Sequence, residues 1–228
     1  MSTTNKTRAT EATVKLISAG GLLDYGTDRS RLLLRIMRTL AQGNPVSTET
    51  VDQLIDELGI SRDDGHAFVS QVAERGPDES VVGMLGLTLN ETQHRFTVNG
   101  NQLFTWCALD TLFLPIALGE AASIESESPL GNAKVRLTVS PQRVEAVEPV
   151  GAVVSIVVVD PDTADIGSVE AIWGTFCHHI FFFATRSDAQ AWAAGRDNRD
   201  AIEIVSVDEA YELGQLLSST LLGQAGEQ

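Results

Sequence analysis

The spacing of apolar residues changes near residue 80, and this change limits the possible folds more than any other feature of the sequence. Before it, apolar residues recur at helical spacing, as in the segment DRSRLLLRIMRTLAQG of residues 28–43. After it, short runs rich in Val, Ile, Leu and Phe alternate with Gly, Pro and Asn, a pattern typical of strands and turns. The sequence therefore predicts a helical N-terminal domain over residues 1–80 and an α+β domain over residues 81–228.

Within the helical part, residues 46–76 have the outline of two helices joined by a tight turn. Ser47 or Thr48 is suited to cap a helix that runs through Leu58, because its side-chain oxygen accepts a free N–H of the first turn. Gly59 is expected to end that helix, and Ser61 to cap the next. This outline is that of a helix-turn-helix, a motif of many DNA-binding proteins.

The charge of this segment argues against DNA binding. Residues 47–75 carry seven acidic and two basic side chains, and the second helix begins with Arg62, Asp63 and Asp64. A recognition helix lies between DNA phosphates, which repel carboxylates. We therefore expect a structural helical domain, with DNA binding as the alternative.

The charge of the whole chain also argues against DNA binding. Its 228 residues carry a formal net charge of −15 at pH 7. Proteins bind nucleic acids and anionic membranes mainly through Lys and Arg, so neither is expected as a partner. Residues 1–45 differ, with seven basic and three acidic side chains. Four of these arginines lie in the helix of residues 28–43, which we interpret as presenting a solvated basic face.

The sequence also indicates a compartment. No stretch approaches the roughly 18 apolar residues of a membrane span, and the polar N-terminus lacks the apolar region of a secretory signal. We therefore expect a cytoplasmic protein. Its two cysteines, Cys107 and Cys177, are then expected to be reduced thiols, with a single disulfide as the alternative. Residues 1–28 are expected to form a disordered arm.

The second half is expected to contain several strands and few helices. Asn99 and Gly100 predict a tight hairpin turn between two of the strands. Ser187 is expected to cap a short helix, and Ser206 or Asp208 the last one. The expected strands cover residues 81–90, 94–98, 101–104, 121–128, 133–140, 151–160, 175–184 and the first few residues of 203–223; the expected helices cover residues 106–119, 186–195 and the remainder of 203–223.

Cys107 and Asp110 stand out in the expected helix of residues 106–119. Three residues apart, they would share one helix face, with their Cβ atoms about 5–6 Å apart. A carboxylate in such an apolar run is unfavourable unless it is paired or protonated. Trp106 is placed to form a wall beside such a site. The alternative is that Cys107 and Trp106 are core residues, and Pro115 is expected to kink or end the helix.

The second cysteine, Cys177, lies in an expected strand. Side chains alternate along a strand, so Cys177 and His179 would share a face that His178 does not. The phenylalanines around them favour a core strand. A zinc site is the alternative, but the segment lacks the paired Cys or His spacing of such sites.

Several segments together resemble one protein family, the bacterial organomercurial (alkylmercury) lyases. LFTWCALDTLFLP, at residues 103–115, resembles the active-site segment of that family. GLTLNET precedes it, and LTVSP, AVEPVGAVVS, FCHHIFFFA and IVSVDEAYELGQ follow, all in the order of the family. The resemblance covers residues 30–220. It implies a winged-helix-like helical domain followed by a mixed α/β catalytic domain with antiparallel sheets.

The resemblance also implies an active site of two cysteines and an aspartate. By motif, Cys107 matches the first cysteine, Asp110 the aspartate and Cys177 the second cysteine. These three residues would bind the mercury of the substrate and of the product. His178 stands where many members have another cysteine, and a further structural cysteine of the family is absent. Neither of these two positions is catalytic in the family, but the differences are expected to affect how tightly the metal is retained and how stable the protein is.

The implied reaction is protonolysis, in which alkyl- or arylmercury yields a hydrocarbon and Hg(II). Thiolates are the preferred ligands of a soft ion such as mercury. A second thiolate weakens the carbon–mercury bond, and the departing carbon needs a proton. Asp110 is the expected donor, since an apolar environment and nearby thiolates raise the pKa of a carboxyl group. No catalytic role is expected for His178 or His179.

The resemblance further implies what the reaction needs and what receives its product. No resident cofactor is expected, but turnover would need a small thiol, and Hg(II) would leave on solution thiols or to a mercuric reductase. Two alternatives remain. The chain could bind Hg(II) or another soft metal without catalysis, or it could be a metal-responsive helix-turn-helix regulator.

Overall fold

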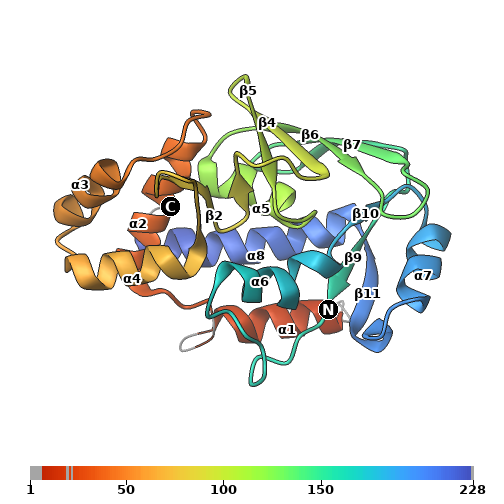
Figure 1. Ribbon diagram of the computed structural model, residues 1–228. Coiled ribbons are helices and arrows are strands. Elements are labelled where there is room, and N and C mark those ends of the chain that lie inside the picture. Colours follow the sequence, from red (N-terminus) through yellow and green to blue (C-terminus); the bar gives the residue numbers. More distant parts are fainter. Residues whose placement is uncertain (1–6, 19–20, 22, 227–228) are drawn as a thin grey trace.

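The computed structural model describes residues 7–18, 21 and 23–226. Its central element is the long helix α8 (Val207–Ala225), which crosses the middle of the molecule in Figure 1. Helix α5 (Asp110–Leu118) packs along one side of α8, and helix α1 (Arg8–Ile17) lies on the other side. Three segments that are far apart in the sequence are thereby brought together.

Three helices form between residues 26 and 72, and the last two begin at the predicted capping residues. They are α2 (Gly26–Leu40), α3 (Thr48–Leu58) and α4 (Arg62–Val72). The Ser47 hydroxyl accepts the Thr50 N–H, Gly59 ends α3 with a φ of 69°, and the Ser61 hydroxyl accepts the Asp64 N–H. The helix-turn-helix outline of this segment is therefore present.

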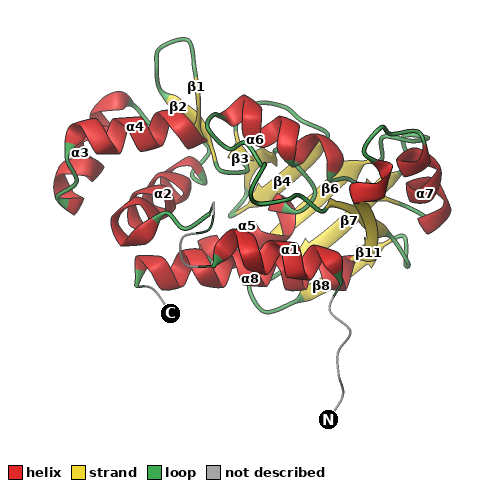
Figure 2. Cartoon of the chain, turned by 90° about the horizontal axis from the view of Figure 1, so that it is seen from below, coloured by secondary structure: helices red, strands yellow, loops and turns green. Residues whose placement is uncertain are grey.

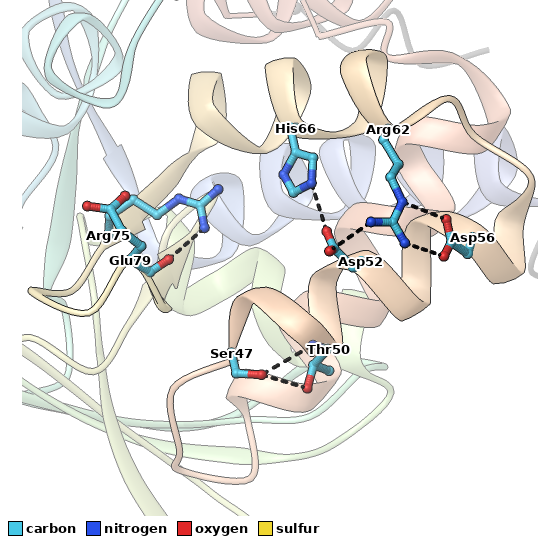
Figure 3. A network of polar contacts seen from close by, with 8 residues as sticks. All are labelled: Ser47, Thr50, Asp52, Asp56, Arg62, His66, Arg75 and Glu79. Atoms are coloured by element: carbon cyan, nitrogen blue, oxygen red, sulfur yellow. Dashed lines mark hydrogen bonds and ion pairs between the residues drawn. The ribbon is translucent and has the colours of Figure 1, made fainter.

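A polar network joins α3 to α4 (Figure 3). The Arg62 guanidinium lies 2.7 Å from an Asp56 carboxylate oxygen and 3.1 Å from one of Asp52. The His66 ring contacts the other Asp52 oxygen at 2.8 Å. The basic side chain at the start of α4 is thus engaged with carboxylates of its neighbouring helix.

The expected disordered arm is wrong for the residues that form α1. The Thr7 side chain accepts the Thr10 N–H to cap this helix, and Ala9 and Leu16 are buried. At its N-terminus, Glu203 accepts the Ala9 N–H at 2.9 Å and pairs with Arg8 at 2.8 Å. Because this partner lies far away in the sequence, local patterns could not predict the ordering. Residues 1–6, 19–20 and 22 of the expected arm lie outside the described residues.

The larger sheet is antiparallel throughout its described pairs. The Asn99–Gly100 turn has φ angles of 50° and 79°, so the predicted tight hairpin is confirmed. In spatial order the strands are β1 (Ala73–Arg75), β2 (Val81–Met84), β3 (Leu87–Thr88), β5 (Asn101–Thr105), β4 (His94–Val98), β6 (Ala122–Glu127), β7 (Lys134–Val139) and β8 (Val144–Glu148).

A smaller antiparallel sheet also contacts α8, and its strand β11 (Ile202–Ser206) leads directly into this helix. The sheet contains β10 (Phe182–Phe183), β9 (Val153–Val157) and β11 in that order. The connecting elements are α6 (Val169–Thr175), α7 (Arg186–Ala194) and the 3₁₀ turns η1 (Cys177–His179) and η2 (Arg199–Ala201). The antiparallel sheets and the mixture of helices and strands agree with the predicted α+β class.

Three local expectations in the second half are wrong. The predicted strand over residues 81–90 is divided into β2 and β3, because Leu85 and Gly86 form a turn with positive φ angles of 38° and 95°. The predicted strand over residues 175–184 is reduced to β10, because α6 ends at Thr175 and η1 occupies Cys177–His179. A run of Phe, Ile and His is compatible with any buried conformation, so its composition does not identify a strand. Helix α7 is capped by Thr185, which accepts the Asp188 N–H, and not by Ser187.

One apolar core extends through both parts of the chain. It includes Leu33 of α2, Phe113 of α5 and Leu213 of α8, and strand β1 of the larger sheet begins before residue 80. In the view of Figure 2, the helices α2, α3 and α4 gather at one end and the sheet at the other. The division at residue 80 and the winged-helix description stay predictions. Among the described residues, no helix has the length and apolar character required to cross a membrane.

Helices α5 and α8 approach closely at Gly214. A Cβ atom there would lie 3.1 Å from the backbone carbon of Leu112 and the nitrogen of Phe113. Nearby, the Ser218 hydroxyl donates to the Phe113 carbonyl at 2.9 Å. The position of α5 therefore depends on the absence of a side chain at residue 214.

We expect Gly214→Ala to reduce the free energy of unfolding by roughly 1–3 kcal/mol, because the added methyl overpacks a backbone contact. Gly223→Ala in the same helix is the control, since a Cβ atom there meets nothing within 4 Å. That control should stabilise the protein by about 0.5–1 kcal/mol through lower chain entropy. Urea unfolding measures both, and equal effects would contradict the close contact.

Candidate active site

The first cysteine lies in a bend immediately before α5. Residues 106–109 form this bend and turn, and the helix begins at Asp110. The Asp110 carboxylate reaches back and accepts the Cys107 backbone N–H at 2.8 Å. The expectation that both residues share a helix face is therefore wrong. The hydrogen bond nevertheless brings them together, because a carboxylate three residues ahead can accept a free N–H before a helix.

Further hydrogen bonds fix this bend. The Thr105 hydroxyl donates to the Cys107 carbonyl at 2.9 Å, and the Thr111 hydroxyl donates to the Ala108 carbonyl at 2.7 Å. Pro115 lies inside α5, which continues to Leu118 rather than ending at the proline. Threonine side chains thus hold the carbonyl groups of Cys107 and of the next residue, Ala108.

The second cysteine lies in η1 and not in a strand. Cys177 is the first residue of this 3₁₀ turn, which is separated from α6 by Phe176 alone. The backbone N–H of Ala108 donates to the Ile180 carbonyl at 3.2 Å, which joins the two cysteine segments. Because a 3₁₀ turn does not alternate its side chains, the expected shared face of Cys177 and His179 is not formed.

The structure brings the three candidate residues together. The ligand atoms of Cys107, Asp110 and Cys177 all lie within 4.8 Å of one another. Both thiols are free and buried, and the Asp110 carboxylate is half-buried. Two sulfur donors at this distance, with a carboxylate beside them, form a donor set suited to a soft metal.

The two histidines beside Cys177 lie outside this cluster. The His178 side chain is exposed and its ring lies 6.2 Å from the ring of Trp173. The His179 ring hydrogen-bonds with the Gly174 carbonyl at 3.1 Å. Neither residue belongs to the group whose ligand atoms converge.

A cavity of about 130 Å³ opens onto the three residues. Trp106 lies on its wall, as the sequence suggested. Most of the remaining wall is aliphatic and comes from distant segments: Leu16 of α1, Ile172 of α6 and Leu221 of α8. These contributions could not be foreseen from sequence, because each of the three residues resembles an ordinary core position.

Burial changes the acidity of the aspartate. Loss of solvent raises the pKa of Asp110 from 3.8 to about 7, while hydrogen bonds from the Cys107 thiol and backbone N–H oppose the change. An acid with this pKa holds and releases a proton near neutral pH. Asp110 therefore has the acidity of a general acid–base group.

The thiols are also less acidic than in water. Burial raises the pKa of Cys107 well above 9, and the neighbouring Cys177 and Asp110 raise it further. For Cys177, the hydrogen bond from Cys107 lowers the pKa, but burial and Asp110 outweigh it and leave the pKa raised. Both cysteines are thus protonated at neutral pH, and binding a metal requires that their protons leave.

Gly86, which the sequence analysis missed, lies against the aspartate. It lies in the turn between β2 and β3 with a φ of 95°, and its carbonyl accepts a hydrogen bond from the Trp106 backbone N–H at 2.9 Å. A Cβ atom at Gly86 would lie 2.6 Å from the Asp110 carboxyl carbon. The sequence analysis placed Gly86 inside the expected strand of residues 81–90, and nothing in the sequence indicated which residue it approaches.

Comparisons with known proteins identify relatives of this chain. A sequence profile described as MerB, alkylmercury lyase, matches residues 87–219. An alkylmercury lyase of Pseudomonas putida is 35% identical over 226 residues, and the match covers 96% of each chain. An alkylmercury lyase of Streptomyces lividans is 37% identical over 195 residues, covering 82% of this chain and 81% of the relative.

A solved structure is similar in fold. It is described as the crystal structure of the mercury-bound form of MerB2 and aligns with a TM-score of 0.72 at 24% identity. The alignment covers 92% of this chain and 99% of the other. Together with the profile match and the identity to these relatives over most of their length, the comparisons show that the chain belongs to the alkylmercury lyase family.

Proposed function

We propose that this protein cleaves the carbon–mercury bond of organomercurials by protonolysis, with Cys107 and Cys177 as mercury ligands and Asp110 as the proton donor. The observation that carries the proposal is the convergence of two thiols and a carboxyl group within 4.8 Å. Family membership supports the reaction class. The pKa of Asp110, raised by burial to about 7, supports its role.

The first steps load the substrate. The mercury of R–Hg–X binds one thiol as X departs, and because the Cys107 and Cys177 thiols hold their protons tightly, a base is needed. The Asp110 carboxylate is placed to accept one proton, and the other leaves with X. A second sulfur then binds the metal and increases the electron density on it.

The bond-breaking step uses the proton held by Asp110. The electron pair of the carbon–mercury bond remains with carbon, and carbon takes the proton, so that RH leaves. Mercury stays as Hg(II) bound to two thiolates. Atoms and charge balance as R–Hg–X plus two thiols giving RH, HX and the Hg(II) dithiolate. No electron is exchanged, so the reaction requires no redox cofactor.

The cavity supports this chemistry by excluding water. Its aliphatic lining from α1, α6 and α8 surrounds the organic group and leaves Asp110 as the proton source beside the metal. An apolar environment also strengthens the interaction between the developing carbanion and its proton donor.

We further propose how the product leaves. A buried Hg(II) dithiolate is released by exchange with an incoming thiol, so turnover requires a small solution thiol or the cysteines of a mercuric reductase. The reducing cytoplasm would supply such thiols and keep Cys107 and Cys177 reduced, in agreement with the two free cysteines. Mercury detoxification is the corresponding biological role.

Hydrocarbon release tests the proposed reaction. With phenylmercury or methylmercury and excess small thiol, we expect the wild type to release benzene or methane, measured by gas chromatography. Cys107→Ser and Cys177→Ser should lose release, because a hydroxyl is a poor ligand for mercury. Asp110→Asn should bind mercury with release reduced about 100-fold or more, the typical contribution of a general acid.

The variants also separate catalysis from sequestration. A wild type that binds mercury stoichiometrically but releases no hydrocarbon would be a metal-binding protein and would overturn the proposed reaction. Normal release by Asp110→Asn would leave the reaction intact but overturn the role of this residue.

The raised pKa of Asp110 predicts a pH dependence of stability. Its pKa is about 7 in the folded protein and near 3.8 when exposed, so the folded state binds the proton more tightly. The resulting stabilisation is fully present below about pH 4 and is lost as the pH rises through about 7. Its size is on the order of 1–4 kcal/mol.

Urea unfolding at several pH values tests this prediction. Asn at position 110 does not titrate, so the stability of the wild type relative to Asp110→Asn should decline between about pH 4 and pH 8. A stability difference that does not change with pH would show that the carboxyl group keeps its ordinary pKa.

Gly86→Ala should lower activity through Asp110. The added Cβ atom collides with the carboxyl group, so we expect hydrocarbon release to fall about tenfold or more as Asp110 is displaced. Gly100→Ala is the matched control, because Gly100 also has a positive φ of 79° in a hairpin turn but meets nothing within 4 Å. Both variants should lose stability, and only Gly86→Ala should lose activity.

A further inference from the structure

Trp106, the residue before Cys107, is held by a carboxylate from the far edge of the larger sheet. Its indole Nε1–H donates to Oε1 of Glu74, which belongs to β1. The other oxygen of Glu74 accepts from the Asn90 side-chain amide at 2.6 Å. Both carboxylate oxygens of Glu74 are thus engaged, one at the indole and one at the surface.

The sheet leaves room for this carboxylate. Glu74 is paired with Gly83 in the register of β1 and β2. A Cβ atom at Gly83 would collide with Glu74 and would lie 2.8 Å from its carboxyl carbon and 3.0 Å from the Thr88 hydroxyl. Because Gly83 has no side chain, the Glu74 side chain can occupy this space and reach Trp106.

The indole held in this way forms part of the cavity wall. Trp106 is 8% exposed and lines the cavity together with Cys107 and Cys177. Its ring packs edge-on against Trp173 of α6, with centroids 5.7 Å apart and planes at 79°. The Glu74 hydrogen bond and this aromatic contact together define one orientation of the indole.

We propose that Glu74 is a positioning residue which, with Asn90, locks the Trp106 indole as a rigid wall beside Cys107 and thereby gives the site a preference for aromatic over small alkyl organomercurials. The inference rests on the proposed function, because it concerns the organic group of that substrate. A fixed indole offers an aryl group a flat apolar surface, and aromatic pairs are favourable beyond their area alone. A methyl group gains little from that surface.

The size of the cavity agrees with this preference. Its volume is about 130 Å³ and its lining is mostly apolar. A dry apolar cavity of roughly 150 Å³ binds benzene in another protein. The cavity is therefore close to the volume that a phenyl group fills, provided that its indole wall does not move.

The test compares phenylmercury with methylmercury as substrates. Glu74→Met keeps the length of the side chain but removes both acceptors, which leaves the indole N–H without a partner. We expect the ratio of kcat/KM for phenylmercury to that for methylmercury to fall about tenfold. The change should appear mainly in KM for phenylmercury.

Three further variants separate positioning from general damage. Glu74→Gln should restore most of the ratio, because its amide oxygen still accepts the indole N–H and the Asn90 amide can rotate to match it. Asn90→Ala should lower the ratio by a smaller factor. Glu125→Met is the matched control: Glu125 pairs with Lys134 and Arg136 on the same sheet and touches no indole, so its ratio should stay at the wild-type value.

A spectroscopic readout follows the indole itself. In a Trp173→Phe/Trp192→Phe background, Trp106 is the remaining tryptophan. Adding Glu74→Met to that background should increase the quenching of its fluorescence by acrylamide, and Glu74→Gln should not. If Glu74→Met unfolds the protein, Asn90→Ala provides both measurements.

The outcomes distinguish this inference from the proposed function. Unchanged substrate ratios and unchanged quenching in Glu74→Met and Asn90→Ala would overturn the inference while leaving the reaction in place. Increased quenching with an unchanged ratio would overturn the substrate preference. If the wild type releases no hydrocarbon, the proposed function fails, and the preference is then measured as the ratio of the two dissociation constants.

Discussion

The site depends on one hydrogen bond, which the Cys107 backbone N–H donates to the Asp110 carboxylate. It holds a carboxyl group at the start of α5, beside two buried thiols, where burial raises the pKa of the acid to about 7. The absence of a side chain at Gly86 leaves room for the carboxyl group at this position, and the close contact of α5 with Gly214 of α8 sets the position of the helix. A group that would be destabilising in an ordinary core is thereby kept with the acidity that proton transfer requires.

The surroundings of the three residues explain why the site needs most of the chain. Helix α1 covers the cavity and is attached through Arg8 and Ala9 to Glu203 of β11, near the opposite end of the sequence. Helices α6 and α8 supply further aliphatic wall. These aliphatic side chains surround Cys107, Asp110 and Cys177 only when the segments pack together, so α1 contributes to the environment of the candidate site as well as to the core.

Local patterns predicted a large part of the secondary structure. Ser47, Gly59 and Ser61 mark the ends of α3 and α4 because capping is a local interaction, and Asn99–Gly100 marks its hairpin for the same reason. The predictions failed where tertiary packing decided the conformation. Cys177 lies in a 3₁₀ turn within an apolar run that resembled a strand, and α1 is ordered by a partner near the other end of the chain.

The sequence by itself determined the chemistry: two cysteines and an aspartate within recognisable segments, and hence the family and its reaction class. Side-chain identity and local spacing are sufficient for that. Only the tertiary structure decided that Cys177 lies beside Cys107, that Gly86 leaves room for the Asp110 carboxyl group, and that Glu74 accepts the Trp106 indole N–H. The distances between these groups, and the burial that raises the pKa of Asp110, arise from contacts between segments distant in sequence, which no local pattern contains.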